Sequence, residues 1–365
     1  MSYNKIIVED ADRMFNDLNK DQQSFFKDST IMLTGAAGFL GYTFLHFFCL
    51  KAKELQVKKV IALDNFMLRT PAWIEKLDKD FDFLELKKFD VISDKFEDVE
   101  GADDVNVIIH MASIASPTFY RKYPIETIDA NITGLRKLLD FYREKDIRGL
   151  LFFSSSEIYG DPSPDAVPTD EEYRGLVSCT GPRACYDESK RFGETMCMLY
   201  AQKYNMPITV ARPFNNYGPG MDINDLRVPA DFAKSVLNKE DIVILSDGTP
   251  KRTFCYVADA VTGYLKVLAS GKYNYFNIGI DKPEISITEL AETYKRAIKE
   301  LNGTEINVVK KVSTDKEYLT HNPQRRCPKI DKARSMLDYN PKIYVEEGVS
   351  RFLKFLAIEL NMECK

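Results

Sequence analysis

The sequence has few of the residues that build disulfide frameworks or metal sites. Its 365 residues include only seven cysteines and three histidines. The cysteines are odd in number and never occur as Cys-x-x-Cys, and the histidines are far apart in the chain. This pattern argues against a disulfide framework and against a metal site, and it favours a reducing, cytoplasmic location.

A basic charge excess and a membrane-directed segment are also lacking. Lysine and arginine number 50 against 55 acidic residues, so a net charge of −5 favours no nucleic-acid partner. The first residues contain no apolar signal-peptide core. Residues Ile31–Leu50 carry no formal charge, but Gly35, Gly38 and Gly41 interrupt them. We therefore interpret this stretch as a buried strand, a glycine loop and a helix, and expect no membrane span.

What the sequence does contain is the alternation of an α/β protein. Hydrophobic residues make up 44% and charged residues 29%, as in ordinary globular proteins. Near-continuous apolar runs, which suit parallel strands covered on both faces, alternate with longer helical patterns. The pattern predicts a Rossmann-type, doubly wound parallel sheet. The predicted strands are Ile31–Thr34, Val60–Asp64, Phe83–Leu86, Val105–Met111, Gly149–Ser154, Ile208–Pro213 and Phe276–Ile280, and the predicted helices include Phe39–Lys53, Pro124–Glu144 and Asp187–Tyr204.

The domain organisation is predicted to be interleaved. Residues 1–28 are polar with amphipathic stretches, which suggests a helical extension without evident chemistry. Residues 29–212 form the predicted dinucleotide-binding domain, and residues at about 256–281 return to its sheet. Proline and glycine become frequent after Arg212, so residues 213–255 and 282–365 are predicted to form a smaller substrate-binding lobe.

The first motif with chemical content is TGAAGFLG, Thr34 to Gly41, where a strand meets a helix. Glycines there permit a tight turn and close backbone approach to a diphosphate at the helix N-terminus. Asp64 ends the next strand, 23 residues after Gly41, where a carboxylate can bind the ribose hydroxyls of NAD. The motif therefore predicts NAD binding, although Arg69 is close enough in sequence to leave NADP open.

The second motif is YDESK, which places Tyr186 and Lys190 on one face of a helix. An ammonium favours the phenolate, so the lysine is expected to lower the pKa of the tyrosine toward that of a useful base. Ser155 lies in the run LFFSSSEIYGDP, Leu151 to Pro162, at the carboxyl end of a predicted strand, where open α/β sheets bind ligands. We expect its hydroxyl to bind a substrate hydroxyl beside Tyr186.

These motifs occur in the order seen in the extended short-chain dehydrogenase/reductases, and the sequence resembles the NAD-dependent epimerase/dehydratases among them. The resemblance covers roughly residues 30–355. Within that family, the blocks at 116–127, 181–195, 251–261 and 322–330 are most similar to the UDP-glucuronate decarboxylases, also called UDP-xylose synthases. The similarity implies a bound NAD, a nucleotide-sugar substrate and a homodimer.

The resemblance also implies roles for individual residues. Tyr186 would be the base for the sugar C4 hydroxyl, with Lys190 and Ser155 as its partners. Ser156, Glu157 and Arg252 would complete the decarboxylase set, and a carboxylate so close to a substrate carboxylate is expected to have a raised pKa. The implied NAD contacts are Gly35, Gly38, Phe39, Leu40, Gly41, Asp64, Asn65, Asp90, Val91, Tyr186 and Lys190. The implied contacts of the nucleotide sugar are Ser116, Asn215, Arg252 and Arg325.

The predicted reaction is decarboxylation of UDP-glucuronate to UDP-xylose through a 4-keto intermediate, with the hydride returned to C4. A C4 epimerase or 4,6-dehydratase is the alternative, and a non-catalytic NAD-binding regulator is a third. Dehydratases of this family carry an aspartic acid beside the glutamate, where this sequence has Ser156. The decarboxylases usually carry arginine after Gly-Pro, where this sequence has Gly220. That departure concerns the sugar and the nucleotide more than the NAD chemistry.

The homodimer is predicted to form through two helical segments with more apolar residues than one face needs. Pairing of the two segments from each chain would give a four-helix interface, whereas burial against the chain's own sheet is the alternative. The residues concerned are Leu135, Leu138, Leu139 and Phe141 on the first segment and Met196, Met198 and Leu199 on the second.

Overall fold

The computed structural model describes residues 3–312, 323–360 and 362. Its centre is a seven-stranded, wholly parallel sheet, with the strand order β11-β6-β5-β4-β1-β2-β3. The order reverses between β1 and β4, which is the arrangement of a Rossmann-like fold. The strands are β1 Thr30–Thr34, β2 Lys59–Asp64, β3 Leu84–Lys88, β4 Val107–His110, β5 Gly149–Phe153, β6 Ile208–Pro213 and β11 Asn274–Ile278.

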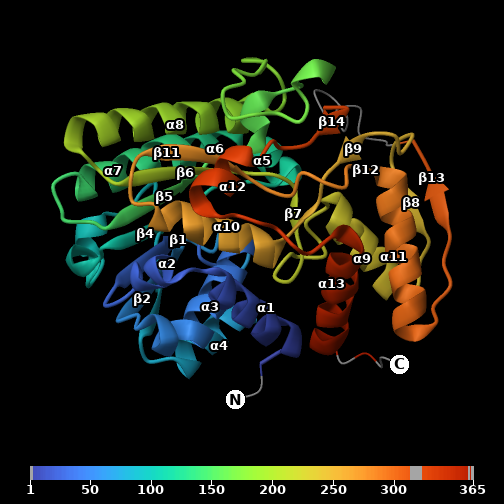
Figure 1. Ribbon diagram of the computed structural model, residues 1–365, viewed down its shortest axis with the longest axis horizontal. Helices are drawn as coiled ribbons and strands as arrows, with labels where there is room; N and C mark the ends of the chain where they lie inside the picture. The colour runs from blue at the N-terminus through green and yellow to red at the C-terminus, as the bar shows by residue number, and fades with distance from the viewer. Residues whose placement is uncertain (1–2, 313–322, 361, 363–365) are drawn as a thin grey trace.

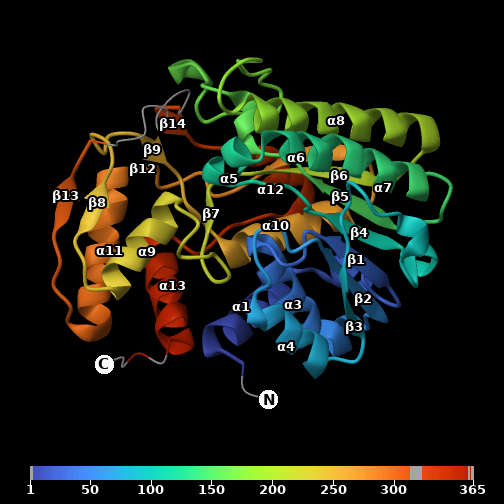
Figure 2. The ribbon, with the colours of Figure 1, turned by 180° about the vertical axis from the view of Figure 1, so that it is seen from behind.

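Helices cover both faces of this sheet (Figures 1 and 2). Buried apolar side chains from the strands and helices form one core on each face, which explains why the strands are apolar almost without interruption. One face carries α3 Phe39–Leu55, α4 Ala72–Asp80 and α10 Val257–Ala269. The other carries α6 Pro124–Asp129, α7 Leu135–Tyr142 and α8 Ala184–Tyr204, with the short α5 Pro117–Lys122 near the start of α6.

The predicted elements occur in the structure with small differences at their ends. The predicted strand Val105–Met111 is shorter, because the ladder of β4 pairs only residues 107–110 with β1. The predicted helix Pro124–Glu144 contains a π-helical stretch at Ala130–Gly134 between α6 and α7. The uncharged stretch Ile31–Leu50 forms β1 and most of α3, both buried. No helix in the described ranges is long and apolar enough to cross a membrane.

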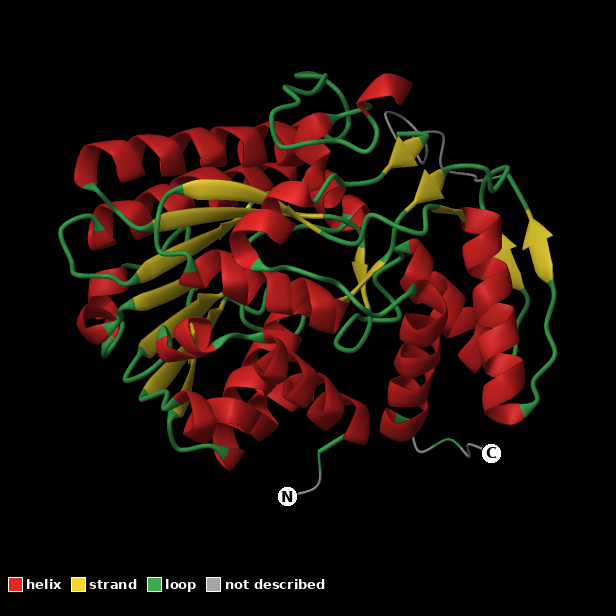
Figure 3. Cartoon of the chain, viewed as in Figure 1, coloured by secondary structure: helices red, strands yellow, loops and turns green. Residues whose placement is uncertain are grey.

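A second group of elements lies beside the carboxyl edge of the sheet (Figure 3). It consists of three small sheets, formed by β10 with β7, by β12 with β9 and β14, and by β13 with β8, and of helices packed around them. These elements are β7 Asn216–Tyr217, α9 Val228–Leu237, β8 Ile242–Ile244, β9 Lys251–Arg252, β10 Cys255–Tyr256, β12 Ile285–Ser286, α11 Ile287–Asn302, β13 Val308–Lys310, β14 Arg325–Arg326 and α13 Val345–Glu359. We call this group the second lobe. Helix α12 Asp331–Leu337 instead packs against β11 and α10 of the sheet domain.

The N-terminal segment forms α1 Lys5–Asp17 and α2 Lys20–Ser24. Helix α1 packs against α3, α10 and α13, so it contacts both the sheet domain and the second lobe. Asp10 is buried there, and its carboxylate accepts hydrogen bonds from Arg351 at 2.6 Å and from Tyr256 at 2.7 Å. The segment is therefore an integral part of the packed structure.

Candidate active site

A cavity of about 890 Å³ lies at the carboxyl edge of the parallel sheet, where strands β1, β2, β4, β5 and β6 end and the second lobe begins. Every candidate site residue of the sequence analysis except Arg325 lines this cavity. They are Gly35, Gly38, Phe39, Leu40, Gly41, Asp64, Asn65, Asp90, Val91, Ser116, Ser155, Ser156, Glu157, Tyr186, Lys190, Asn215 and Arg252.

The glycine loop between β1 and α3 leaves no room for side chains. Gly35 has a φ of +71°, and a Cβ there would lie 2.7 Å from the backbone nitrogen of Ala112. A Cβ on Gly41 would lie 2.2 Å from the carbonyl oxygen of Ala36. Gly38 begins α3 without a side-chain cap, so the first N–H groups of this helix are left for a ligand. Such a helix start suits a diphosphate.

Asp64 ends β2 beside this loop and is held by backbone donors. One carboxylate oxygen accepts a hydrogen bond from the Ala37 N–H at 2.9 Å, and the other accepts one from the Phe66 N–H at 2.8 Å. Burial raises the pKa of Asp64. Arg69, which had left NADP open, forms an ion pair of 2.5 Å with Asp222 of the second lobe. Its charge is therefore already matched by a carboxylate.

Asp90 and Asn65 lie next to each other after β3 and β2. The amide of Asn65 donates to the Asp90 carboxylate at 3.4 Å, and Asp90 accepts the N–H of Ile92 at 2.9 Å. With the glycine loop and Asp64, they form a continuous wall of the cavity at the end of the sheet. The narrow glycine turn, the uncapped helix and the strand-end carboxylate together fit a dinucleotide.

Tyr186 and Lys190 lie on the first turns of α8 and face the cavity. The ammonium of Lys190 donates to the carbonyl of Phe153 at 2.8 Å and lies 5.7 Å from the centre of the Tyr186 ring. Burial lowers the pKa of Lys190 to about 7. Burial also raises the pKa of Tyr186 to about 12, and its hydrogen bond with Ser155 only partly offsets this. The predicted lowering of the tyrosine pKa is therefore not found, because burial of the phenol outweighs its hydrogen bond with Ser155.

Glu157 lies in the 3-10 turn Ser156–Tyr159 after β5 and contacts two arginines. Its carboxylate oxygens accept hydrogen bonds from Arg326 at 2.5 and 2.6 Å, and Arg183 forms a second ion pair with it. Burial would raise the pKa of Glu157, but the two arginines outweigh it and hold the pKa at about 2. The raised pKa expected from the sequence depends on a substrate carboxylate and stays a prediction, whereas the chain's own arginines act in the opposite direction. Asp187 instead has its pKa raised to about 7, by burial and by the charge of Glu157.

Arg325 and Arg326 form the two-residue strand β14, so their side chains point in opposite directions. Arg325 binds Glu284 at 2.7 Å outside the cavity, whereas Arg326 lines the cavity. Arg326 also pairs in register with Arg252 of the neighbouring strand β9. Burial and the charge of Arg326 lower the pKa of Arg252 to about 9. Arg183 and Arg326 were missed by sequence reasoning, and the only signal for Arg326 was the Arg-Arg pair itself.

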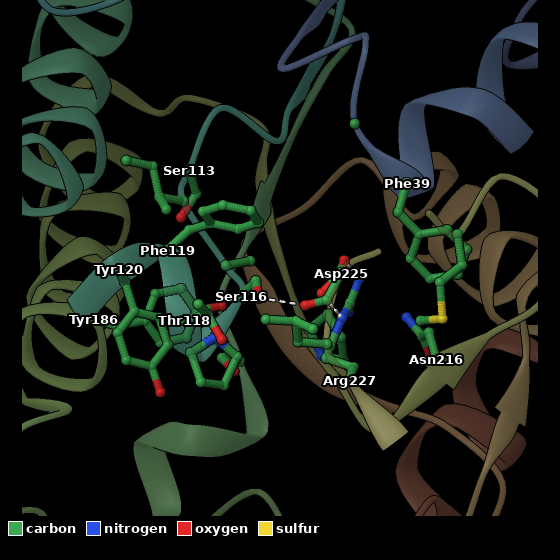
Figure 4. A pocket seen from close by; sticks show the side chains of 18 of the residues that line it. Phe39, Ser113, Ser116, Thr118, Phe119, Tyr120, Tyr186, Asn216, Asp225 and Arg227 are labelled. Atoms are coloured by element: carbon green, nitrogen blue, oxygen red, sulfur yellow. Dashed lines mark hydrogen bonds and ion pairs between the residues drawn. The ribbon is translucent and has the colours of Figure 1, made fainter. Parts of the chain in front are cut away.

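The other predicted substrate contacts lie where the second lobe meets the sheet domain (Figure 4). The hydroxyl of Ser116 donates to the carbonyl of Asp225 at 3.2 Å, and the Asp225 carboxylate pairs with Arg227 at 2.6 Å. The amide of Asn215 donates to the carbonyl of Thr253 at 2.9 Å. Tyr120, one turn after Ser116 on α5, stacks on Tyr186 with a ring separation of 5.1 Å.

Gly220 packs against α3. It has a φ of +87°, and a Cβ at this position would lie 2.6 Å from the Cβ of Tyr42. A larger residue such as arginine does not fit here while Tyr42 keeps its place. The departure from the decarboxylase pattern therefore coincides with close packing between the second lobe and α3.

Comparisons with known proteins agree with this geometry. Residues 31–279 match the description "NAD dependent epimerase/dehydratase family". UDP-glucuronic acid decarboxylase 6 of Arabidopsis thaliana is 34% identical over 346 residues, which cover 95% of this chain and 94% of that protein. UDP-glucuronic acid decarboxylase 1 of Xenopus tropicalis is 34% identical over 331 residues, covering 91% of this chain and 73% of that protein.

Solved structures confirm the fold. An epimerase of Methanothermobacter thermautotrophicus superposes with a TM-score of 0.77 at 23% identity, covering 93% of this chain and 96% of that chain. The UDP-glucuronic acid 4-epimerase of Bacillus cereus, in complex with UDP-glucuronic acid and NAD, gives a TM-score of 0.73 at 22% identity, covering 90% and 99%. At these identities the likeness concerns the fold alone.

Proposed function

Because the chain belongs to the NAD-dependent epimerase/dehydratase family, we propose that it decarboxylates a UDP-hexuronate, converting UDP-glucuronate to UDP-xylose. NAD is the cofactor of this family, and the glycine loop, the start of α3 and Asp64 fit it. Bound NAD supplies an acceptor, and later a donor, for the hydride at C4 of the sugar. The relatives named UDP-glucuronic acid decarboxylase, which align along most of the chain, favour this reaction over others of the family.

The observation that carries the proposal is an arginine-lined wall next to Tyr186. Arg183, Arg252 and Arg326 all line the cavity, and the first and last of these hold Glu157. Guanidinium groups bind carboxylates in a planar, two-point geometry. A substrate carboxylate near Arg252 and Arg326 would also reduce the repulsion that lowers the Arg252 pKa. A sugar with a C6 carboxylate therefore suits this wall.

The residues around C4 have the groups that the oxidation needs. Tyr186 accepts the proton of the C4 hydroxyl in its phenolate form, which a protonated Lys190 behind the tyrosine ring favours, and Ser155 orients the sugar hydroxyl. Once C4 is a ketone, the C5–C6 bond is β to it, so loss of carbon dioxide leaves a resonance-stabilised enolate at C4 and C5. The arginines hold the departing carboxylate and support the enolate charge. C5 then takes up a proton from solvent, and Tyr186 gives the hydroxyl proton back to the C4 oxygen when C4 is reduced again.

Ser156 argues against 4,6-dehydration. That reaction needs an acid to expel the C6 hydroxyl, and a serine hydroxyl is far too weak an acid at neutral pH. Glu157, which follows it, is held ionised by Arg183 and Arg326 with a pKa of about 2. Neither residue is therefore suited to donate a proton to a leaving hydroxyl.

The deciding assay incubates the NAD-loaded protein with UDP-glucuronate and follows carbon dioxide and product mass. Decarboxylation predicts carbon dioxide and a five-carbon sugar nucleotide. A product that keeps six carbons would replace this proposal with a C4 epimerase. Tyr186→Phe is the matched variant, because an enzyme should lose turnover with that hydroxyl while a non-catalytic NAD-binding regulator would not.

We also propose a homodimer, with a smaller contact surface than the two helical segments that the sequence suggested. Leu135, Leu138 and Leu139 are fully buried in the chain's own core, so they are not available to a partner. Phe192 and Leu199, seven residues apart on α8, are each 51% exposed. This spacing places both on one face of α8, which is the face we propose for the contact. The cytoplasmic location stays a prediction.

A further inference from the structure

The cavity extends into the second lobe, where it meets a half-buried carboxylate that accepts no hydrogen bond from a described side chain. Asp231 lies in the first turn of α9 and lines the cavity. Among residues 3–312, 323–360 and 362, no side chain pairs with its carboxylate, and Lys234, the cation one turn away, donates to Asn224 at 2.9 Å instead. Burial raises the pKa of Asp231. A carboxylate in such a place is stabilised when a ligand donates a hydrogen bond to it.

Apolar side chains line the cavity at this end, beside the charged groups of Asp225 and Lys234 that act on Asp231. Strand β8 and the turn after it contribute Val243 and Leu245, and Pro250, Phe254 and Ile287 complete this end of the cavity. Ser246 lies in the same turn, and its hydroxyl oxygen accepts the N–H of Gly248 at 3.1 Å, which leaves its own proton for an acceptor. Apolar walls with one strong acceptor and one hydroxyl donor suit a flat heteroaromatic ring.

The position of this end of the cavity indicates which ring it takes. The dinucleotide residues lie at strand ends and loops of the sheet domain, Tyr186 lies on α8 of the same domain, and Asp231 lies on α9 of the second lobe. On the proposed function, the sugar C4 lies at Tyr186, so the nucleotide of the substrate extends away from it. The base is the part of that nucleotide farthest from the sugar. We therefore place it at the remaining part of the cavity, beside α9 and β8.

We propose that Asp231 determines which nucleobase the enzyme accepts, by accepting a hydrogen bond from the ring N–H on the pairing edge of the base. Uracil carries such a donor at N3 and guanine at N1. Cytosine and adenine instead present a ring-nitrogen lone pair at the corresponding position, which a carboxylate repels. The inference rests on the proposed function for the location of the base, but the selection of a ring N–H follows from the carboxylate itself.

A purely structural role for Asp231 is the alternative. An acidic residue in the first turn of a helix is stabilised by the helix dipole, whatever it faces. Loss of that effect would change the stability of α9 equally with every nucleotide. Base selection instead predicts that the ratio of two nucleotide affinities changes, which helix stability does not alter.

The test titrates the NAD-loaded protein with UDP, CDP, GDP and ADP by calorimetry. We expect UDP to bind at least about tenfold more tightly than CDP, the worth of one hydrogen bond to a charged group. In Asp231→Asn the amide N–H can donate to cytosine N3, so the preference for UDP over CDP should fall to about threefold or less. Asp231→Ser, whose hydroxyl both donates and accepts, should reduce the preference for UDP over CDP by a similar factor. Glu240→Gln removes one exposed charge just beyond α9, outside the cavity, and should keep the wild-type ratio.

The outcomes separate this inference from the proposed function. An unchanged UDP-to-CDP ratio in Asp231→Asn and Asp231→Ser overturns the inference, as does an equal loss of preference in Glu240→Gln. Turnover of UDP-glucuronate without any base preference keeps the proposed function and overturns the inference. Tightest binding of GDP, weakened in Asp231→Asn, supports the role of Asp231 and removes the uridine nucleotide from the proposed function.

Discussion

Removing the guanidinium group of Arg326 should affect the cavity more than removing a similar arginine outside it. Arg326 is 9% exposed and donates to both oxygens of Glu157. Arg326→Met keeps much of the apolar length of the side chain but leaves Glu157 with Arg183 as its only remaining ion-pair partner among the described residues. A buried carboxylate that loses one of two partners is destabilised, because the cost of its burial remains.

The size of the effect follows from the pKa of Glu157. It lies at about 2 against an ordinary value of 4.5, which corresponds to about 3 kcal/mol in favour of the folded state, at about 1.4 kcal/mol per unit. This energy is what remains after the cost of burial is subtracted from the attraction of two arginines, so the loss of one should remove more than half of it, about 2 kcal/mol. For a chain of 365 residues, this lowers the melting temperature by about 3 °C at pH 7. The difference from wild type should shrink as the pH falls from 4.5 toward 2, because protonation of Glu157 removes the contribution of the pair.

The assay compares melting temperature and UDP-glucuronate turnover of wild type and Arg326→Met. Turnover should fall about a hundredfold, since Glu157 and the arginine wall lose their alignment. Arg334→Met is the matched control, because Arg334 binds Asp281 at 2.6 and 2.9 Å outside the cavity. It should lose some stability and keep its turnover. Turnover of Arg326→Met within twofold of wild type, with an unchanged melting temperature, would refute the reasoning.

Three further predictions concern other parts of the site. Asp64→Ala should weaken NAD retention at least about tenfold, because it removes the carboxylate acceptor at the end of β2. Extraction of NAD from the purified protein measures this retention. Retention equal to that of wild type would contradict the role of Asp64 at the ribose. Lys190→Met should raise the melting temperature of the NAD-free protein more at pH 6 than at pH 9. Burial lowers the pKa of Lys190 to about 7, so the buried ammonium destabilises the fold most below that pH. A rise in melting temperature that does not depend on pH would contradict this prediction. Leu199→Asp should give a monomer by light scattering. Ile125→Asp, at an exposed position on α6, is the control for added surface charge. A dimer that persists in Leu199→Asp would exclude this face of α8 as the dimer contact.

The sheet and its helices were predictable because their signals are local. Continuous apolar runs marked the strands, and the three glycines of residues 35–41 marked the turn into α3. The ends of elements were less predictable, since they depend on which neighbours the backbone finds. Strand β4 ends at His110 because its ladder with β1 ends there, and the π-helical stretch at Ala130–Gly134 had no signal in the apolar pattern.

The candidate site was predictable only where its residues lie within one segment. Tyr186 and Lys190 are one helical turn apart, so their proximity follows from spacing alone. Glu157 and Arg326 are 169 positions apart, and only the packing of the second lobe brings them together. The Arg-Arg pair in the sequence did not show which side chain faces inward, because strand β14 was not recognised.

The pKa values were less predictable than the positions. Sequence spacing suggested a lowered pKa for Tyr186, and the structure reverses that direction. For Glu157 the sequence indicated only the effect of a substrate carboxylate and gave no sign of the arginines that lower its pKa. Each inference considered one neighbour, whereas the pKa depends on burial and on all charges nearby. For Tyr186 burial dominates, and for Glu157 two arginines from other segments dominate.

The contacts that orient the reacting groups also join the two parts of the molecule. Glu157 belongs to the sheet domain and Arg326 to the second lobe, and the same division applies to Arg69 with Asp222. Ser116 and the carbonyl of Asp225 form a third such contact. A substitution at this junction is therefore expected to change substrate binding and turnover together, because the same ion pairs and hydrogen bond join the two lobes and position the reacting groups. Substitutions confined to the glycine loop should instead change NAD retention first, since that wall is formed by the sheet domain alone.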